Sequence, residues 1–281
     1  MEPMQNISNI EGIVPSNETY SLVNLLFQNK LFKSKEINSN SLTISCLNLI
    51  DVERINLTFD DEIDSINLSK NPILKKGQME KELEIMKNIQ FKINSKEMKK
   101  LNQRDQTILK MFKDINKNHE FDLRSMYEKI SKKEVSINFA KYFNDYAKSI
   151  ERENKYSEDN YKDIIKDGEF TLKGNELNKE WKEFKNNLKS NKSFYKVDNE
   201  EEIFDKYLIY GRCFEMEKDV MKNIEKAKPQ YDSSLYTFLK YDGPDLLKMI
   251  FDKGLSNSKI ERKGDGSVPA GNSKYFVPGF G

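Results

Sequence analysis

Two helical stripes that carry aromatic side chains constrain the fold of this chain more than any other feature. In the first stripe, apolar residues recur every three or four positions, as on one face of an α-helix: Leu177, Trp181, Phe184 and Leu188. The second stripe follows a polar connection and contains Tyr207, Leu208, Tyr210 and Gly211. We predict that the two stripes pack together, because large rings along one helical face are what a helix pair buries.

The glycine of the second stripe indicates where the two helices meet. A glycine inside a helix costs about 1 kcal/mol relative to alanine, but it allows two backbones to approach closely. We therefore predict that the helices cross at Gly211. A last short helix is expected from Gly243 to Gly254, which completes a C-terminal helical region over residues 175–255.

Composition predicts a folded protein without a strong attraction to nucleic acid. The 281 residues include 17 Phe and 13 Tyr, too many aromatic residues for a disordered chain, and the length allows more than one core. Forty-seven basic and 46 acidic residues leave a net charge of +1. No global field therefore steers the chain toward phosphate backbones.

The two cysteines and the absence of long apolar stretches indicate a cytoplasmic compartment. Cys46 and Cys213 lie in predicted helices among apolar neighbours, and the sequence has no Cys-x-x-Cys. Neither a disulfide framework nor a thiolate metal site is expected. Residues 20–27 form one of the longest apolar stretches, far short of the roughly 20 residues that a spanning helix needs, and residues 1–6 do not resemble a secretory signal.

The first 70 residues predict a winged-helix-like unit. A helix is expected after Pro15 and a second helix over residues 41–51. Residues 54–59 then alternate polar and apolar side chains as a half-buried strand does. A second short strand is expected around Ile66 and Leu68, which would complete a two-stranded ribbon.

Residues 101–174 predict a second unit with the same plan. Three helical stripes, the last of which contains Phe139 and Phe143, precede a short strand near Phe170. The expected fold is therefore α+β and mainly helical, with tandem winged-helix-like units followed by a C-terminal helical pair. The predicted divisions are two units at 1–70 and 101–174, a linker at 71–100, the helical region at 175–255 and a flexible tail at 256–281.

The C-terminal stripes give the chain a family likeness. The spacing Trp181-x-x-Phe184-x-x-x-Leu188, the run Tyr207-Leu208-x-Tyr210-Gly211 and the glycine-bearing tail from Gly264 to Gly281 resemble the soluble region of the YciQ-like predicted membrane proteins, catalogued as domain of unknown function 2207. Residues 15–57 also resemble the first element of that region. Members of the family have a Tyr-Leu-x-Tyr-Ala helix, whereas this chain has Gly211 followed by Arg212.

The resemblance implies no known catalytic activity. It implies that the chain is either part of a longer membrane protein, on the inner face of the membrane, or a free-standing relative without the membrane portion. No cofactor is implied. The expected partner is another protein or a second copy of the chain.

A winged-helix unit also raises the hypothesis of DNA binding. Recognition helices normally present Arg, Lys, Asn or Gln to bases and phosphates, but residues 41–51 contain no basic residue. In residues 135–153 the basic Lys141, Lys148 and Arg152 are balanced by three acidic residues. These charges argue against nucleic-acid binding and favour a scaffold.

No residue pattern requires a reaction or a metal. His119, the only histidine, lies in a predicted turn, and a general base would need a nucleophile and an orienting acid beside it. We interpret it as an exposed turn residue. The acidic runs Asp60–Asp61 and Glu200–Glu202 are interpreted as solvated charges. Residues Gly264–Gly271 lack the spacing and the Lys-Ser/Thr of a P-loop and are interpreted as linker.

An apolar cluster near the end of the chain leaves two interpretations open. Tyr275, Phe276 and Phe280 follow a polar, glycine-containing stretch. They are candidates for docking onto the body of the protein or onto a partner. The alternative interpretation is a frayed end.

The sequence therefore predicts a non-enzymatic cytoplasmic interaction or scaffold module. Two alternatives stay open. A winged-helix DNA-binding regulator predicts a contiguous positive face and binding that weakens steeply with salt. An uncharacterised hydrolase predicts a deep pocket with polar groups around His119 or a carboxylate pair.

Overall fold

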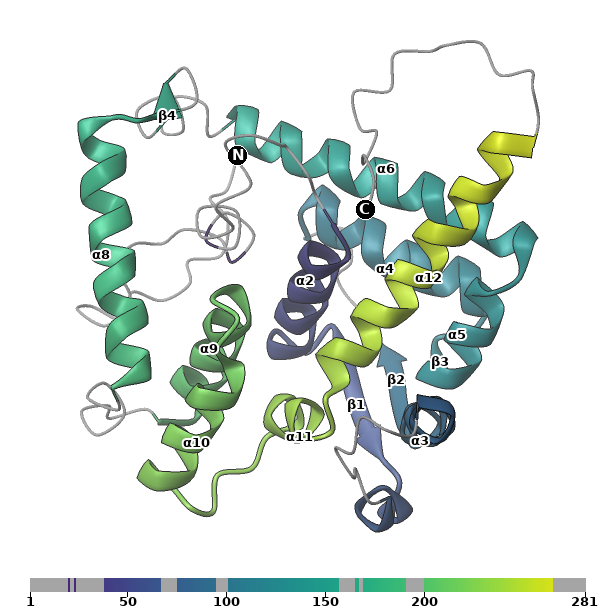
Figure 1. The fold of residues 1–281 in the computed structure, drawn as a ribbon, viewed down its shortest axis with the longest axis horizontal. Helices are drawn as coiled ribbons and strands as arrows, with labels where there is room; N and C mark the ends of the chain where they lie inside the picture. The colour runs from purple at the N-terminus through teal and green to yellow at the C-terminus, as the bar shows by residue number, and fades with distance from the viewer. Residues whose placement is uncertain are drawn as a thin grey trace. The chain divides into compact units, whose positions relative to one another are not determined.

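The fold is mainly helical α+β. The structure is a computed structural model, and it describes Tyr20, Val23 and residues 38–66, 75–94, 101–156, 165–166, 169–190 and 200–264. Within these residues it contains ten α-helices, one 3-10 helix, a three-stranded antiparallel sheet and a two-stranded ribbon (Figure 1). This confirms the predicted fold class at the level of mainly helical α+β.

The described residues form two compact units, each built from separate stretches of chain. We call the described part of residues 37–151 and 237–281 the sheet unit, and that of residues 1–36 and 152–236 the helical unit. This division does not coincide with the predicted boundaries at residues 70, 100, 174 and 255. Two helices, α6 and α11, contain a boundary between the units.

The sheet unit contains the three-stranded sheet and the helices around it. In chain order its elements are α2 (Ser39–Asp51), β1 (Ile55–Phe59), η1 (Asp61–Ser65), α3 (Lys75–Lys87), β2 (Ile89–Ile93), α4 (Gln103–Asn116), β3 (Glu120–Asp122), α5 (Leu123–Ile130), α6 (Lys133–Tyr156), the end of α11 (Ser234–Lys240) and α12 (Gly243–Gly264). The strand order is β1-β2-β3, with Leu57 opposite Phe91 and Phe91 opposite Phe121. Side chains on β1 and β2 alternate between buried and more exposed positions, as expected for a half-buried sheet.

The strand partner of β1 is not the predicted one. Ile66 follows η1 instead of lying in a strand, and Leu68 lies outside the described residues. The partner is β2, inside the segment 71–100 that was predicted to be a linker and that also contains α3. The period-two pattern of Ile89, Phe91 and Ile93 is short and directly follows a charged helix, so the local pattern did not reveal it.

One sheet therefore joins the two predicted winged-helix-like units. β1 comes from the first, β2 from the predicted linker and β3 from the second. The short strand that was expected near Phe170 is present as β5 (Glu169–Phe170), and in the described structure it pairs only with β4 (Ile165–Lys166). The sequence predicted two separate units in tandem. Instead, β1, β2 and β3 pair in one sheet although they are far apart in the sequence.

Local side-chain caps define where several helices begin. The side chains of Asn38, Asn102, Asp122 and Thr171 each accept a hydrogen bond from the backbone N–H three residues later, over 2.7 to 3.1 Å. Such caps satisfy N–H groups that have no partner inside the helix. They begin α2, α4, α5 and α8, respectively.

Phenylalanine rings form the core of the sheet unit. On one face of the sheet, Phe91 lies 6.1 Å from Phe112, 5.7 Å from Phe121 and 5.8 Å from Phe238, measured between ring centroids. Phe251 of α12 continues the cluster, stacked between Phe112 at 6.4 Å and Phe139 at 6.0 Å. This core connects the sheet to α4, α6, α11 and α12.

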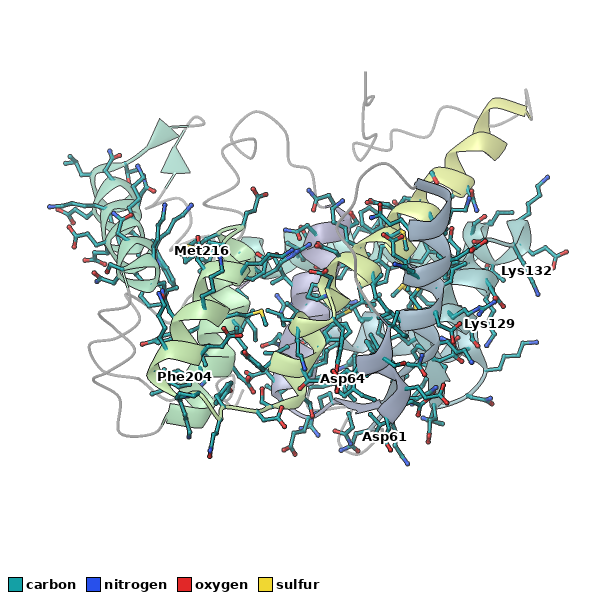
Figure 2. The ribbon with its side chains drawn as sticks, turned by 60° about the horizontal axis from the view of Figure 1, so that its bottom comes forward. Asp61, Asp64, Lys129, Lys132, Phe204 and Met216 are labelled. Carbon is teal, nitrogen blue, oxygen red and sulfur yellow. The ribbon has the colours of Figure 1, made fainter. Side chains whose placement is uncertain are left out.

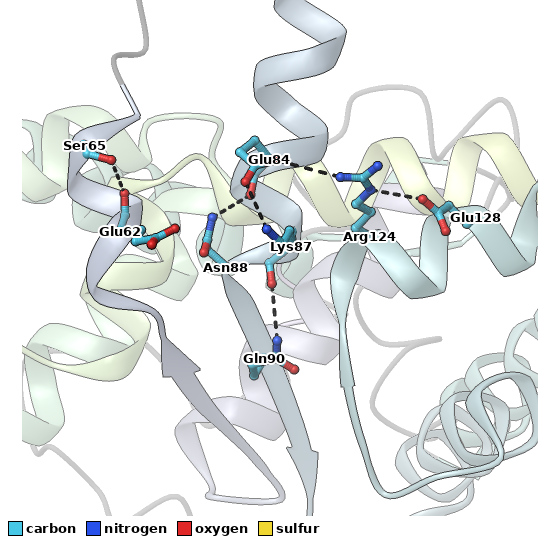
Figure 3. Close-up of polar contacts among 8 residues, drawn as sticks. All are labelled: Glu62, Ser65, Glu84, Lys87, Asn88, Gln90, Arg124 and Glu128. Atoms are coloured by element: carbon cyan, nitrogen blue, oxygen red, sulfur yellow. Dashed lines mark hydrogen bonds and ion pairs between the residues drawn. The ribbon is translucent and has the colours of Figure 1, made fainter.

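Polar contacts at the surface connect further elements of the sheet unit. Asp64 of η1 is labelled in Figure 2. Its carboxyl group accepts hydrogen bonds from Tyr241 and Lys240, and these two donors lower its pKa. Arg124 of α5 lies 3.8 Å from Glu84 of α3 and 3.0 Å from Glu128 (Figure 3). Exposed ion pairs of this kind contribute little to stability.

The last helix continues well beyond its predicted end. Gly254 was expected to terminate it, but α12 runs from Gly243 to Gly264. A Cβ atom on Gly254 would lie 2.6 Å from Phe139 and 2.9 Å from Ile130. The glycine therefore permits close packing of α12 on α5 and α6. Residues 256–264, predicted to be part of a flexible tail, are helical, and residues 265–281 lie outside the described structure.

The helical unit contains β4 and β5 followed by three helices that pack on one another. These are α8 (Leu172–Lys189), α9 (Glu200–Cys213) and α10 (Glu217–Ala227). A tight turn with Glu215 at φ 57° connects α9 to α10. In the described parts of the chain, none of the helices combines the length and the apolar character needed to span a bilayer.

Candidate functional site

The aromatic stripes of α8 and α9 meet inside the helical unit. Trp181 is fully buried, and its ring centroid lies 5.6 Å from Phe184, 5.3 Å from Tyr210 and 6.3 Å from Phe214. Phe184 in turn lies 5.9 Å from Tyr207. The structure thus brings the rings of both stripes together as a core, and they do not line an open cleft.

The remaining residues of the two stripes are buried as well, except for Leu177 at the start of the first stripe. Leu188 and Leu208 are fully buried, whereas Leu177 is only half-buried. Near the end of α8, the amide of Asn223 donates hydrogen bonds to the carbonyl oxygens of Leu188 and Lys189, at 2.7 and 3.3 Å. These contacts place α10 against the C-terminus of α8.

Gly211 faces α10, not α8. A Cβ atom at this position would lie 3.0 Å from both Cα of Glu217 and Cγ2 of Val220. The prediction that the two aromatic stripes cross at Gly211 is therefore wrong. The tight turn after α9 returns the chain along this side of the helix, and Arg212 forms a largely buried ion pair with Glu217 at 2.8 Å.

The aromatic core contains polar atoms, but burial limits their chemistry. Burial raises the pKa of Tyr207, which keeps its hydroxyl group neutral at physiological pH. The indole N–H of Trp181 is buried, and no acceptor for it is found in the described structure. A buried donor without an acceptor costs stability, so this ring is held by its apolar packing.

A second cluster, which the sequence did not predict, lies in the sheet unit. We define the buried polar cluster as Ser45, Cys46, Arg104, Asp105 and Tyr146, all of which are buried. The hydroxyl of Tyr146 donates to the carbonyl oxygen of Ser41 at 2.8 Å and lies 2.9 Å from Oγ of Ser45. Arg104 Nε lies 3.2 Å from Asp105 Oδ1. The cluster connects α2, α4 and α6.

The environment of the buried polar cluster opposes nucleophilic chemistry. Burial raises the pKa of the Cys46 thiol well above its usual value, and the negative charge of Asp105 raises it further. The thiolate, not the thiol, is the nucleophile, so Cys46 is unreactive at neutral pH. Burial also raises the pKa of Tyr146, although Arg104 and the hydrogen bond with Ser45 act in the opposite direction.

No local sequence signal could have identified this cluster. Ser45 and Tyr146 are separated by 101 positions, and serine on a helix indicates neither burial nor a partner. The hydrogen bond forms because α6 returns to pack near α2. The hydroxyl groups of Ser45 and Tyr146 are thus hydrogen-bonded, as buried polar groups usually are. This indicates a structural role for the cluster.

The other residues considered from the sequence do not form a site. His119 is an exposed residue between α4 and β3, as predicted, and its carbonyl oxygen accepts a hydrogen bond from the N–H of Ile93 at 2.7 Å. Asp60 and Asp61 lie at the start of η1, and Glu200 begins α9. Among the residues that the structure describes, no group of three or more His, Cys, Asp or Glu could hold a metal ion.

The predicted tail residues are not among the described residues. Tyr275, Phe276 and Phe280 lie outside the described residues, as does the segment Gly264–Gly271 apart from its first residue, which ends α12. The docking and frayed-end interpretations of the tail therefore both stay predictions. Cys46 and Cys213 are buried free thiols in α2 and α9, in agreement with the interpretation that neither is part of a disulfide.

Comparison with known proteins does not assign a family. No protein-family model matches the chain. No curated protein and no solved structure matches it either. The resemblance to the YciQ-like proteins therefore stays a prediction based on the stripes around Trp181 and Tyr207, and the function has to be argued from the geometry.

Proposed function

We propose that the protein is a non-enzymatic interaction or scaffold module that contacts other proteins or copies of itself. The observation that carries this proposal is the burial of Trp181, Phe184, Tyr207 and Tyr210 against one another. Residues that could have formed an aromatic binding pocket instead stabilise the unit. The YciQ-like resemblance, which would place the chain on the cytoplasmic face of a membrane, belongs to the same proposal.

The fold supports a scaffold because helix α8 has two distinct faces. One face supplies the buried Trp181 and Phe184. The opposite face exposes Lys179, Lys182 and Glu183. A face of mixed charge suits polar contacts with a partner, since complementary charges improve specificity more than affinity.

We also infer a winged-helix-like arrangement within the sheet unit. Its support is the order α4, β3, α5, α6, in which a short strand follows the first helix and two residues connect the last two helices. The strands β1 and β2, which precede this core in sequence, supply the sheet. A single embedded unit of this kind replaces the tandem pair that the sequence predicted.

The interaction proposal can be tested by comparing captured partners. The full chain and a variant with Lys182→Glu and Glu183→Lys would be used for affinity capture, and both would be analysed by sedimentation velocity. We expect the variant to lose a specific partner or a concentration-dependent oligomer, while its circular dichroism stays unchanged. Identical partners and identical oligomeric states for the two proteins would contradict a role for α8.

A separate measurement addresses the enzyme alternative. The purified chain would be assayed with ester, phosphoester and peptide substrates, in parallel with the His119→Ala variant. We expect no turnover by either protein. Turnover by the wild type that the substitution abolishes would overturn the non-enzymatic proposal.

A further inference from the structure

One face of α6 places an acidic and a basic side chain on either side of a half-exposed isoleucine. Ile137, Asn138 and Lys141 follow Glu134 by three, four and seven residues, the spacing of neighbours on one side of a helix. All four residues are exposed, and Ile137 is 50% exposed. We call these four residues the α6 face.

The α6 face is directed outward because the opposite side of the helix is part of the core. Phe139 stacks on Phe251 with ring centroids 6.0 Å apart, and the hydroxyl of Tyr146 donates to the carbonyl oxygen of Ser41 at 2.8 Å. These contacts hold the backbone that presents the face. A partner that binds such a pre-organised surface loses less conformational entropy than one that must first order a loop.

The two charges of the α6 face are not paired with each other or with a neighbour. Neither Glu134 nor Lys141 makes an ion pair or a side-chain hydrogen bond with another residue of the described structure. They lie about 10.5 Å apart along the helix axis, whereas ion pairs on one helix join residues three or four apart. Both charges can therefore meet a partner.

Further along the same side of α6, the sign of the charge continues to alternate. Asp145 lies four residues after Lys141 and three before Lys148, and all three are exposed. Together with Glu134 they make two acidic and two basic side chains, so this surface is of mixed charge. It has no excess of positive charge that would attract the phosphates of nucleic acid or of an anionic membrane. It suits a surface on which the charges alternate in the complementary order.

The order of charges on the α6 face is complementary to itself. Glu134 lies as far before the midpoint between Ile137 and Asn138 as Lys141 lies after it. A second α6, antiparallel and related by a two-fold axis through that midpoint, would place its Lys141 opposite Glu134 and its Glu134 opposite Lys141. Each contact then occurs twice, as in any two-fold symmetric interface. The two Ile137 side chains would meet at the centre with charged pairs around them, the usual order of apolar core and polar rim.

Other pairings of two α6 helices are less favourable. A parallel pair in register sets Glu134 against Glu134 and Lys141 against Lys141. An antiparallel pair centred on Lys141 brings two lysines together. An antiparallel pair centred between Lys141 and Asp145 joins opposite charges, but it moves the centre of the contact away from Ile137. Like charges oppose association and burial of apolar surface drives it, so the pairing around Ile137 is favoured.

We propose that the α6 face binds a second copy of the chain, through an antiparallel pair of α6 helices. This inference rests on the proposed function, because it names one partner of an interaction module, but its site is α6 and not α8. A contact between one helix and its copy is at the small end of specific interfaces. The association is therefore weak and depends on protein concentration.

Sedimentation velocity of the full chain, from about 10 μM to about 1 mM, tests the proposal in the range expected for a small interface. The wild type should show a reversible monomer–dimer equilibrium. Glu134→Lys and Lys141→Glu should each weaken the dimer by about 10-fold or more, because each sets like charges opposite one another in both halves of the contact. The double variant Glu134→Lys/Lys141→Glu should restore the dimer, since the exchanged charges are again complementary.

A mixture of the two single variants tests the pairing in a second way. The Glu134→Lys variant offers two positive charges and the Lys141→Glu variant two negative ones, so the mixture should form a dimer that neither variant forms well alone. Ile137→Ser should weaken the dimer without a change of charge. The matched control Glu183→Lys makes the same change of charge on the exposed face of α8 and should leave the dimer intact. Circular dichroism establishes that each variant is folded.

Three results would overturn the proposal. The first is a wild type that is monomeric over the whole range, as expected if the tail residues Tyr275, Phe276 and Phe280 or a different protein cover the α6 face. The second is a double variant that stays as weak as the single ones, and the third is an equal loss in the α8 control. A monomeric wild type that still captures a partner through α8 would overturn this proposal alone. Absence of both dimer and captured partners would overturn the proposed function as well.

Discussion

Trp181 of α8 and Tyr210 of α9 lie with ring centroids 5.3 Å apart and ring planes inclined by 49°, both buried. The two rings join helices that are separated in sequence by a polar connection. Aromatic pairs at this distance add about 0.5–1.5 kcal/mol beyond the burial of their area. The stability of the helical unit therefore depends on this contact and on the rings around it.

Replacement of Trp181 tests the importance of this core. Trp181→Ala should lower the free energy of unfolding by about 3–5 kcal/mol, because it removes a large buried side chain and leaves a cavity. Trp181→Phe should cost less, since the indole N–H makes no hydrogen bond that would be lost. Urea unfolding followed by circular dichroism measures both changes, with Lys179→Ala as an exposed control on the same helix. A neutral Trp181→Ala variant would show that the ring does not hold the unit together.

The two glycines Gly254 and Gly77 should respond in opposite directions to the same substitution. Gly254→Ala should destabilise the protein by about 1–3 kcal/mol, because the added Cβ overlaps Phe139 and Ile130 in a packed core. Gly77→Ala should stabilise it by about 0.5–1 kcal/mol, since nothing beyond the adjacent residues and the local backbone of helix α3 lies within 4 Å of the added Cβ. Thermal and urea unfolding measure the two values. Equal changes in stability for the two variants would mean that the close packing of Phe139 and Ile130 does not require a glycine at position 254.

Removal of the Tyr146 hydroxyl tests the buried polar cluster. Tyr146→Phe should lower the free energy of unfolding by about 1–2 kcal/mol, because Ser45 loses its buried partner while the ring is kept. The double variant Ser45→Ala/Tyr146→Phe should cost less than the sum of the single changes, since neither polar group then remains without its partner. A strictly additive double-mutant cycle would contradict coupling between the two hydroxyls.

Tyr142 should make stability depend on pH in the alkaline range. Burial, and then its hydrogen bond to Asp114, raises the pKa of Tyr142 from 10.0 to about 12. The unfolded state loses this proton first, so the stabilising contribution is complete below pH 10 and is lost as the pH rises toward 12. Tyr142→Phe should flatten the fall in stability over this window. Tyrosinate absorbance of the folded protein, compared between wild type and variant, assigns the titration.

The regular elements with strong local patterns were predictable from the sequence. The faces of α8 and α9, the alternation along β1 and the sequence of helices from α4 to α6 follow from side-chain periodicity, which depends only on near neighbours. Buried residues such as Trp181 and Tyr210 could be identified for the same reason. The weak pattern of β2 after a charged helix was the exception.

The pairing of these elements was decided by the tertiary structure. Whether β1 pairs with β2 or with residues around Ile66, and whether Gly254 ends a helix or packs inside it, depends on residues far away in the sequence. The same holds for Tyr146, whose hydroxyl finds Ser45 across 101 positions. A periodic pattern indicates which side of a helix or strand is buried. Which other surface covers that side is determined only by packing in three dimensions.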